Sequence, residues 1–214
     1  DDCSILAGAG SAAAVYYSAD AGDHWLTSSK PPSGESDTCV FAAPDFAFTG
    51  TAYAVTRGTE SAFSISRDGG RTWNQTSLVD TRITSILDLA VSPAFNHDNT
   101  LLLLTADLQN SLWRSSSGGL RWERVFHSSP AALERASLVL VSPEYAVNKI
   151  IFLAGSSQGS PVIWKSADNG SSFIKYYSID PWTDGPVGID AWTVAPGDVL
   201  YVAGFDGDHG LVYQ

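Results

Sequence analysis

The sequence predicts an all-β fold built from a repeated module of about fifty residues. Two markers recur along the 214 residues. The first is a short polar pattern that ends on an aromatic residue and opens on Ser18, Ser66, Ser115 and Ser166. The second is an apolar run that ends on Pro44, Pro93, Pro143 and Pro196. The gaps are 48, 49 and 51 residues for the serines and 49, 50 and 53 for the prolines. This period is typical of a propeller or a solenoid.

The polar pattern reads S-x-D-x-G-x-x-W and predicts a tight turn with a structural role. We expect its carboxylate to accept hydrogen bonds from backbone N–H groups two or three residues further on. The glycine can adopt a positive φ, and the aromatic ring can anchor the turn by burial. The four copies comprise Ser18, Asp20, Gly22 and Trp25; Ser66, Asp68, Gly70 and Trp73; Ser115, Ser117, Gly119 and Trp122; and Ser166, Asp168, Gly170 and Phe173.

Each repeat contains enough short apolar runs for four strands. The inner runs cover 39–44, 88–93, 138–143 and 191–196. Second runs cover 51–56, 100–105, 150–155 and 199–204, and third runs cover 62–66, 111–115, 162–166 and 210–214. Fourth strands follow the polar turn, as at 122–126 and 173–177. Four strands in about fifty residues match one propeller blade. One helical turn is expected, at 131–135.

The four polar turns resemble Asp-boxes, also called BNR repeats. Such boxes occur in the β-propellers of sialidases, xyloglucanases, sortilin-type receptors, photosystem II assembly factors and bacterial extracellular proteins. The resemblance covers nearly the whole chain and implies four-stranded antiparallel blades with the box between the third and fourth strands. It implies no particular activity, because catalytic and non-catalytic propellers share the box. Ser117 in place of Asp and Phe173 in place of Trp predict looser turns.

The repeat divides 1–214 into one propeller region with approximate blades at 1–38, 39–87, 88–137, 138–190 and 191–214, the first and last being partial. The first blade is expected to lack its inner strand, and the last to stop before its box. We therefore expect an arc of a larger propeller; a five-bladed ring with irregular end blades is the alternative. Strand edges exposed at the two ends should be covered by a protein partner or by self-assembly.

Composition restricts the classes of function. The net charge is −11 and the isoelectric point is near 4.5, which disfavours nucleic acid and anionic lipid as partners. No apolar run approaches the roughly 20 residues that span a bilayer. The acidic, Trp-rich character fits an extracellular or cell-surface protein, and Cys3 and Cys39 form a possible disulfide there. Two buried free thiols are the alternative. No cofactor or metal is expected.

Two groups of residues could bind a ligand. Tyr176, Tyr177 and Trp182 form an aromatic group beside a long loop, and such groups stack on sugars or anchor protein partners. Asp206, Asp208 and His209 superficially resemble a metal loop, although Asp-Gly between two strands is more often a hairpin turn. We regard both groups as binding candidates, with no metal assigned.

The enzyme alternatives are glycoside hydrolases. A sialidase would need three arginines and the signature Arg-Ile-Pro, whereas Arg82-Ile83-Thr84 lacks the proline. A xyloglucanase-like enzyme would need two acids facing one another across a cleft. The loop acids are Glu35, Asp37, Asp80, Asp88, Glu134, Asp180, Asp184 and Asp190, and nothing in the sequence selects a pair. We therefore assign no catalytic residue and expect a non-catalytic structural or interaction module; a fragment of a glycan-processing enzyme is the alternative.

Overall fold

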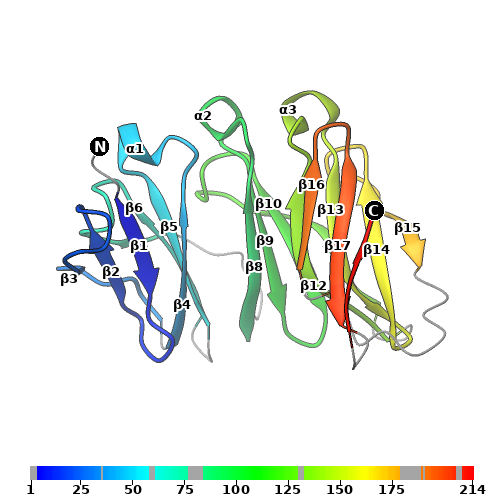
Figure 1. Cartoon of the computed structure of the whole chain (residues 1–214), viewed down its shortest axis with the longest axis horizontal. Helices are drawn as coiled ribbons and strands as arrows, with labels where there is room; N and C mark the ends of the chain where they lie inside the picture. The colour runs from blue at the N-terminus through cyan, green and yellow to red at the C-terminus, as the bar shows by residue number, and fades with distance from the viewer. Residues whose placement is uncertain are drawn as a thin grey trace.

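The fold consists of antiparallel sheets that follow one another in chain order (Figure 1). The computed structural model describes residues 4–34, 36–57, 61–76, 84–129, 133–178, 189, 191–205 and 209–214. The first sheet contains β1 (Ile5–Gly8), β2 (Val15–Ser18) and β3 (Leu26–Thr27). The last contains β16 (Ala191–Ala195), β17 (Val199–Phe205) and β18 (Gly210–Tyr213). This confirms the predicted all-β propeller arc.

Between these ends lie three four-stranded sheets, each with its strands in sequence order. The second sheet contains β4 (Ser36–Ala42), β5 (Ala52–Arg57), β6 (Ala62–Ser66) and β7 (Asn74–Gln75). The third contains β8 (Ser85–Val91), β9 (Leu101–Ala106), β10 (Asn110–Ser115) and β11 (Glu123–His127). The fourth contains β12 (Glu134–Val141), β13 (Ile151–Ser157), β14 (Ser160–Ser166) and β15 (Ile174–Ser178).

The inner strands are longer than their apolar runs predicted. β4, β8 and β12 begin at Ser36, Ser85 and Glu134, three or four residues before the expected starts at 39, 88 and 138. Each contains a register shift near its start, for example between Ile86 and Asp88. A bulge breaks the alternation of apolar and polar residues, so the pattern hides the first residues of the strand. The predicted blade boundaries at 1–38, 39–87, 88–137, 138–190 and 191–214 stay a prediction.

The helical turn predicted at 131–135 is wrong over its described part. Glu134 and Arg135 belong to β12 and pair with Ser157 and Ser156, while 131–132 lie outside the described residues. Leu133 has a φ of 51°, which is incompatible with a right-handed helix. Pairing with the long strand β13 therefore outweighs the local helix preference.

Short helical turns occur instead after the prolines. They are α1 (Phe46–Thr49), α2 (Phe95–Asp98) and α3 (Tyr145–Asn148), at the same end of the sheets (Figure 1). Each ends on a residue in the left-handed region: Gly50, Asn99 or Lys149. Their carbonyl groups accept N–H bonds from the polar turns of the same sheets, at 3.0 Å from Gly69, 3.0 Å from Gly118 and 3.2 Å from Asn169. These bonds join the two hairpins at this end of each sheet.

The core lies between successive sheets. One cluster joins Tyr53, Val55 and Phe63 of the second sheet to Leu103 and Trp113 of the third. Equivalent clusters join the third sheet to the fourth and the fourth to the fifth. Each sheet therefore has a leading face toward the preceding sheet and a trailing face toward the following one. Burial on both faces explains why β9 begins with four consecutive leucines, all inaccessible to solvent.

Candidate interaction surfaces

In all four polar turns the opening serine accepts the N–H of the glycine, and the second copy shows the full geometry. The Ser66 hydroxyl donates to Asp68 Oδ1 at 2.8 Å and accepts the N–H of Gly70 at 2.9 Å. Asp68 Oδ1 accepts the N–H of Thr72 at 2.9 Å, and Oδ2 accepts the Thr72 hydroxyl at 2.5 Å. Gly70 has a φ of 87°, and the equivalent glycines of the other copies have values between 87° and 98°. The positive φ at this glycine is confirmed.

The expected partner of the carboxylate was right in part. In the first, second and fourth copies, Asp20, Asp68 and Asp168 accept the N–H four residues further on. The N–H three residues on, from Arg71 or Ser171, contributes a weaker bond to Asp68 and Asp168. The N–H groups of the aspartate and of the glycine two residues on donate to the serine hydroxyl instead. The buried serine oxygen thus closes the turn, and the aspartate connects that serine to the start of the next strand.

These hydrogen bonds lower the pKa of the turn aspartates. The His24 N–H and then the Ser18 hydroxyl bring the pKa of Asp20 to about 2. The Ser172 hydroxyl and N–H bring the pKa of Asp168 to about 2 as well. For Asp68, partial burial raises the pKa, but hydrogen bonds from Thr72 and Ser66 outweigh it and the pKa is lowered. All three aspartates are therefore structural carboxylates held in the ionised form.

The third copy retains its turn without a carboxylate. Gly119 N–H donates to Ser115 Oγ at 2.9 Å, and Arg121 N–H donates to Ser117 Oγ at 3.0 Å. The two serine hydroxyl oxygens lie 3.3 Å apart, a longer contact than the 2.7 or 2.8 Å from serine to aspartate elsewhere. A single hydroxyl replaces two carboxylate oxygens, so the copy is held by fewer and weaker bonds.

The turn aromatics pack on the preceding sheet. Trp73 is buried with Val15 of the first sheet, and its indole N–H lies 3.2 Å from Ser28 Oγ. The Trp122 ring contacts Phe63 edge to face, with centroids 5.4 Å apart. Phe173 contacts Phe126 in the same way at 5.2 Å. The second, third and fourth turns therefore each connect their own sheet to the preceding one.

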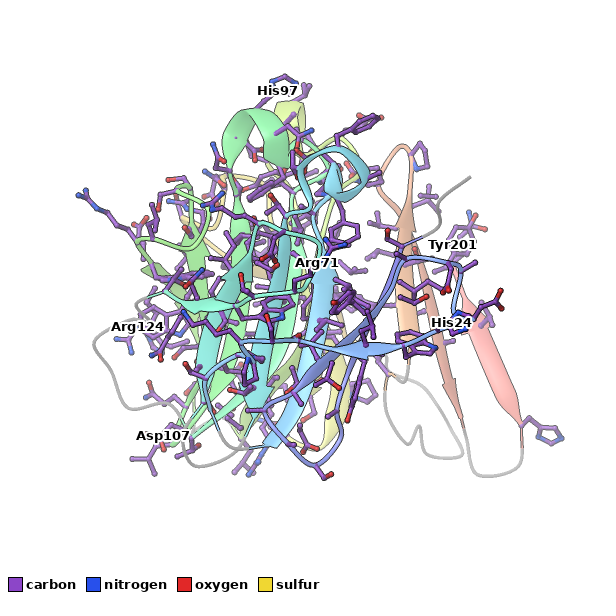
Figure 2. The ribbon with its side chains drawn as sticks, turned by 90° about the vertical axis from the view of Figure 1, so that its left-hand side faces the viewer. His24, Arg71, His97, Asp107, Arg124 and Tyr201 are labelled. Carbon is purple, nitrogen blue, oxygen red and sulfur yellow. The ribbon has the colours of Figure 1, made fainter. Side chains whose placement is uncertain are left out.

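The first sheet presents an uncovered leading face. Trp25 is 44% exposed, whereas Trp73 at the same repeat position is 1% exposed. Tyr16 is 40% exposed, whereas the equivalent Trp113 and Trp164 are 7% and 3% exposed. Tyr16 lies on β2 and Trp25 directly precedes β3; His24, next to Trp25 in the chain, is labelled in Figure 2. We call Tyr16 and Trp25 the leading end surface.

The last sheet presents an uncovered trailing face. Val212 pairs with Ala203 on β17, at the repeat position of Phe63, Leu112 and Ile163. Val212 is 73% exposed, whereas those three side chains are 0%, 0% and 3% exposed. Tyr201, two residues before Ala203 and labelled in Figure 2, is 38% exposed, although the equivalent Tyr53 and Leu102 are fully buried. We call Tyr201 and Val212 the trailing end surface.

Most of the binding residues predicted from sequence lie beyond what the structure describes. Trp182, Asp206 and Asp208 are outside the described residues, and His209 is exposed just before β18. Tyr176 and Tyr177 belong to β15, but their side chains are not described. The aromatic group and the Asp206–His209 loop stay predictions. Over the described ranges, no group of three or more His, Cys, Asp or Glu side chains is arranged to hold a metal ion.

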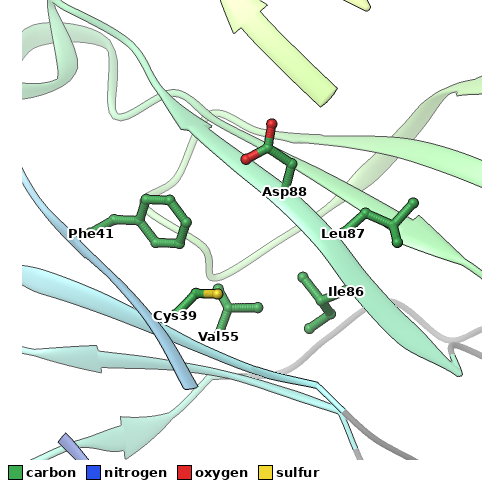
Figure 3. A pocket seen from close by; sticks show the side chains of 6 residues that line it. All are labelled: Cys39, Phe41, Val55, Ile86, Leu87 and Asp88. Atoms are coloured by element: carbon green, nitrogen blue, oxygen red, sulfur yellow. The ribbon is translucent and has the colours of Figure 1, made fainter. Parts of the chain in front are cut away.

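Cys39 lies on β4 at a small cavity of about 30 Å³ (Figure 3). Its neighbours there are Phe41 and Val55 on one side, and Ile86 and Asp88 of β8 on the other. The cavity holds about one water molecule. Cys39 is a free thiol here, and Cys3 is outside the described residues, so the disulfide stays a prediction.

Two of the loop acids have structural partners. Asp88 Oδ1 accepts the N–H of Leu89, and Oδ2 accepts the N–H of Val139 in the next sheet, both at 2.8 Å. Glu134 accepts the Ser129 N–H at 3.1 Å and forms an ion pair with Lys175 at 3.1 Å. Asp37 lies in the β4 bulge with a φ of 46°. The acids at 35, 80, 180, 184 and 190 lie outside the described residues.

Comparison with known proteins identifies the fold class. No protein-family model and no curated protein matches the chain. Solved structures do match. A GH74 enzyme of Niastella koreensis has a TM-score of 0.60 and 24% identity over 82% of this chain and 28% of its own. The NanB sialidase of Streptococcus pneumoniae has a TM-score of 0.53 and 18% identity over 89% of this chain and 32% of its own.

Two further similar structures are of other proteins. YCF48 of Cyanidioschyzon merolae has a TM-score of 0.56 and 15% identity over 82% of this chain and 52% of its own. A nidogen/laminin complex contains a chain with a TM-score of 0.60 and 10% identity. These likenesses show the fold alone: the protein is a β-propeller. It spans about a third or less of the two enzymes named above.

Within the described residues, no helix is both long enough and apolar enough to cross a membrane.

Proposed function

We propose that this chain is a non-catalytic interaction module, extracellular or at the cell surface, whose two end surfaces are covered by protein. The observation that carries the proposal is the exposure of Trp25 and Val212 at positions that are buried between sheets elsewhere in the molecule. Large apolar side chains in contiguous exposed patches mark protein interaction sites. The natural cover is another sheet of this kind, because the interior sheets bury the same positions against one another.

Two of the similar structures support a role in protein binding. One is YCF48 bound to a D1 peptide, with a TM-score of 0.51, and the other is the nidogen/laminin complex. Both were solved with protein partners. They differ from this chain in sequence, at 14% and 10% identity, so they support the class of function and not the identity of the partner.

Self-association tests the proposal directly. The 214-residue chain should show a mass above that of the monomer in light scattering as its concentration rises, or should capture a protein partner through the end surfaces. Trp25→Ser and Val212→Asp should each weaken that association. Leu108→Asp is the matched control, because Leu108 is 88% exposed on the β9–β10 hairpin, away from both end surfaces. A monomer at every concentration that also captures no partner would contradict the proposal.

Localisation is tested separately. Antibody detection on intact and lysed source cells should place the protein at the surface or in the medium. Detection solely after lysis would refute an extracellular location while leaving the association experiment unaffected.

A second candidate is a fragment of a glycan-processing enzyme, favoured by the likeness to the GH74 enzyme and to NanB sialidase. The contacts of Asp88 and Glu134 argue against a catalytic role for these two acids. Their carboxylates already accept hydrogen bonds from backbone N–H groups, and Glu134 also pairs with Lys175. Hydrolysis of xyloglucan or a sialoside by the purified chain, lost in Asp37→Asn, would favour the enzyme. Glycan binding without hydrolysis, lost in Trp182→Ala, would favour the predicted aromatic group.

A further inference from the structure

A polar cavity lies between the second and third sheets, at the end that carries α1 and α2 (Figure 1). Its volume is about 250 Å³, which corresponds to about eight water molecules. The second sheet supplies Asp45, Thr49, Tyr53 and Arg67, and the third supplies Asn96 and Asn99. Four of these side chains, those of Thr49, Arg67, Asn96 and Asn99, are exposed, so the cavity opens to solvent.

The repeat explains why this space is open. At the same place between the third and fourth sheets, Asn169 Oδ1 accepts the Tyr145 hydroxyl, and the Asn169 carbonyl accepts the Arg114 guanidinium. The positions of these three residues are taken here by Gly118, Phe95 and Ile65. All three changes remove polar atoms, and Gly118 also removes the side chain that would fill the space. The interface between the third and fourth sheets is thus closed by polar contacts that the interface between the second and third sheets lacks.

The second sheet contributes polar groups that have lost such partners. Tyr53 is fully buried, and its hydroxyl has no hydrogen-bond partner among the described residues. Its ring is fixed by Phe63 and Phe95, with centroids 5.6 Å away in each case. Burial raises the pKa of Tyr53, the charge of Arg67 opposes that shift, and the charge of Asp45 adds to it. A neutral, unsatisfied hydroxyl thus lies within electrostatic reach of one cation and one anion.

Asp45 is hydrogen-bonded by a neutral side chain, that of Asn96, and not by a cation. With its amide nitrogen turned toward Asp45, Asn96 donates to both carboxylate oxygens, at 3.2 and 3.1 Å. Each oxygen retains a free lone pair, since a carboxylate accepts about four hydrogen bonds. No ion pair to Arg67 occurs within the described ranges. A buried polar group without a partner costs free energy unless something fills its site.

We propose that this cavity binds a small zwitterion of the free α-amino acid class. The carboxylate of the ligand would bind Arg67 and accept the Tyr53 hydroxyl, and its ammonium group would donate to Asp45. Guanidinium–carboxylate and charge-assisted bonds are the strong hydrogen bonds of proteins. The volume limits the ligand to a small side chain.

Calorimetric titration of the full chain with L-serine tests the proposal. We expect saturable binding at one site, with N-acetyl-L-serine and L-serinamide at least about tenfold weaker because each lacks one charge. Absence of L-serine binding at millimolar concentration would overturn the proposal. Equal binding of all three compounds, or binding of glucose in their place, would also overturn it.

Gly118→Asn provides the sharpest variant, because it copies the residue that fills the next interface. Gly118 and Asn169 have the same φ of 63°, and a Cβ at Gly118 would meet only Phe95, at 3.8 Å. The variant should fold and lose serine binding by about tenfold or more. Gly159→Asn is the matched control, at a φ of 85° with open space around it, and should bind normally. Unchanged binding in Gly118→Asn would overturn the proposal.

Tyr53→Phe separates binding from structure. It removes the unsatisfied hydroxyl, so the free protein should unfold at the same or a higher temperature while serine binding weakens about tenfold. Arg67→Gln and Asp45→Asn should also weaken binding. These two variants replace Gly118→Asn as the test of the site if Gly118→Asn fails to fold. A Tyr53→Phe variant that binds serine as well as the parent would contradict the assigned site.

Discussion

At the scale of single residues, the serine of each repeated turn carries more of the geometry than the aspartate after which such turns are known. Ser66 Oγ accepts the N–H of Gly70 within a buried environment, whereas Asp68 lies nearer the surface and joins Ser66 to Thr72. The pattern S-x-D-x-G-x-x-W predicted a turn. It did not predict which oxygen accepts which N–H group. The serine and aspartate side chains are both acceptors, and they lie only two residues apart in the chain.

The turn aspartates should make stability depend on acid pH. Their pKa is lowered in the folded state, to about 2 for Asp20 and Asp168, from an unfolded value near 3.9. Their contribution is therefore complete above about pH 4 and is lost as pH falls toward about 2. Urea midpoints measured from pH 5 to pH 2 should fall over this window. Asp168→Asn should flatten the fall more than Asp23→Asn does, because Asp23 is exposed and only its backbone N–H, not its carboxylate, bonds within the turn; equal slopes would contradict this account.

The third turn offers the reverse experiment. Ser117→Asp should restore the missing carboxylate, which can accept both the Ser115 hydroxyl and the Arg121 N–H. We expect a gain of about 1 kcal/mol in the free energy of unfolding at neutral pH. Denaturant titration measures it, and Ser116→Asp is the control because Ser116 is exposed within the same turn. A gain of the same size in both variants would indicate a general charge effect.

At the scale of elements, the second, third and fourth polar turns each connect two sheets. A Cβ at Gly70 would lie 2.6 Å from Leu6 of the first sheet, and one at Gly119 would lie 2.7 Å from Phe63 of the second. These glycines are therefore required by packing as well as by their positive φ. The sequence pattern showed the need for glycine but not the close approach, which depends on a residue about fifty positions away.

The aromatic positions separate interior interfaces from the ends of the arc. Trp73→Ala should cost about 3 to 5 kcal/mol, because it removes a fully buried ring between two sheets. Trp25→Ala should cost much less, about 1 kcal/mol or below, because the equivalent ring is 44% exposed. Chemical denaturation of the two variants side by side measures the difference. Similar losses would show that the leading end surface is covered within the protein itself.

At the scale of the whole molecule, stability should vary along the arc. The central sheets are packed on both faces, whereas the first and last sheets each have one uncovered face. Amide hydrogen exchange should be slowest in β9 and β13 and faster in β1–β3 and β16–β18, because local opening is easiest where few apolar contacts are lost. Association through the end surfaces should slow exchange in the end sheets. Uniform protection along the isolated chain would contradict this picture.

The sequence by itself determined the repeat, the class of fold and the positions of most second and third strands. These features depend on local chemistry: glycine at a positive φ, proline at the end of a strand, and apolar runs that must be buried. It could not locate the starts of β4, β8 and β12, because bulges interrupt the alternation there. Nor could it show that Glu134 would join a strand.

Only the tertiary structure decided which of the equivalent residues are covered and which are not. Trp25 and Trp73 occupy the same position in the repeat, and only the presence of a preceding sheet distinguishes them. Likewise, the cavity beside Tyr53 arises from Phe95 and Gly118, which reach it from the neighbouring sheet. Burial and open space are properties of pairs of sheets, whereas a sequence pattern describes one sheet at a time.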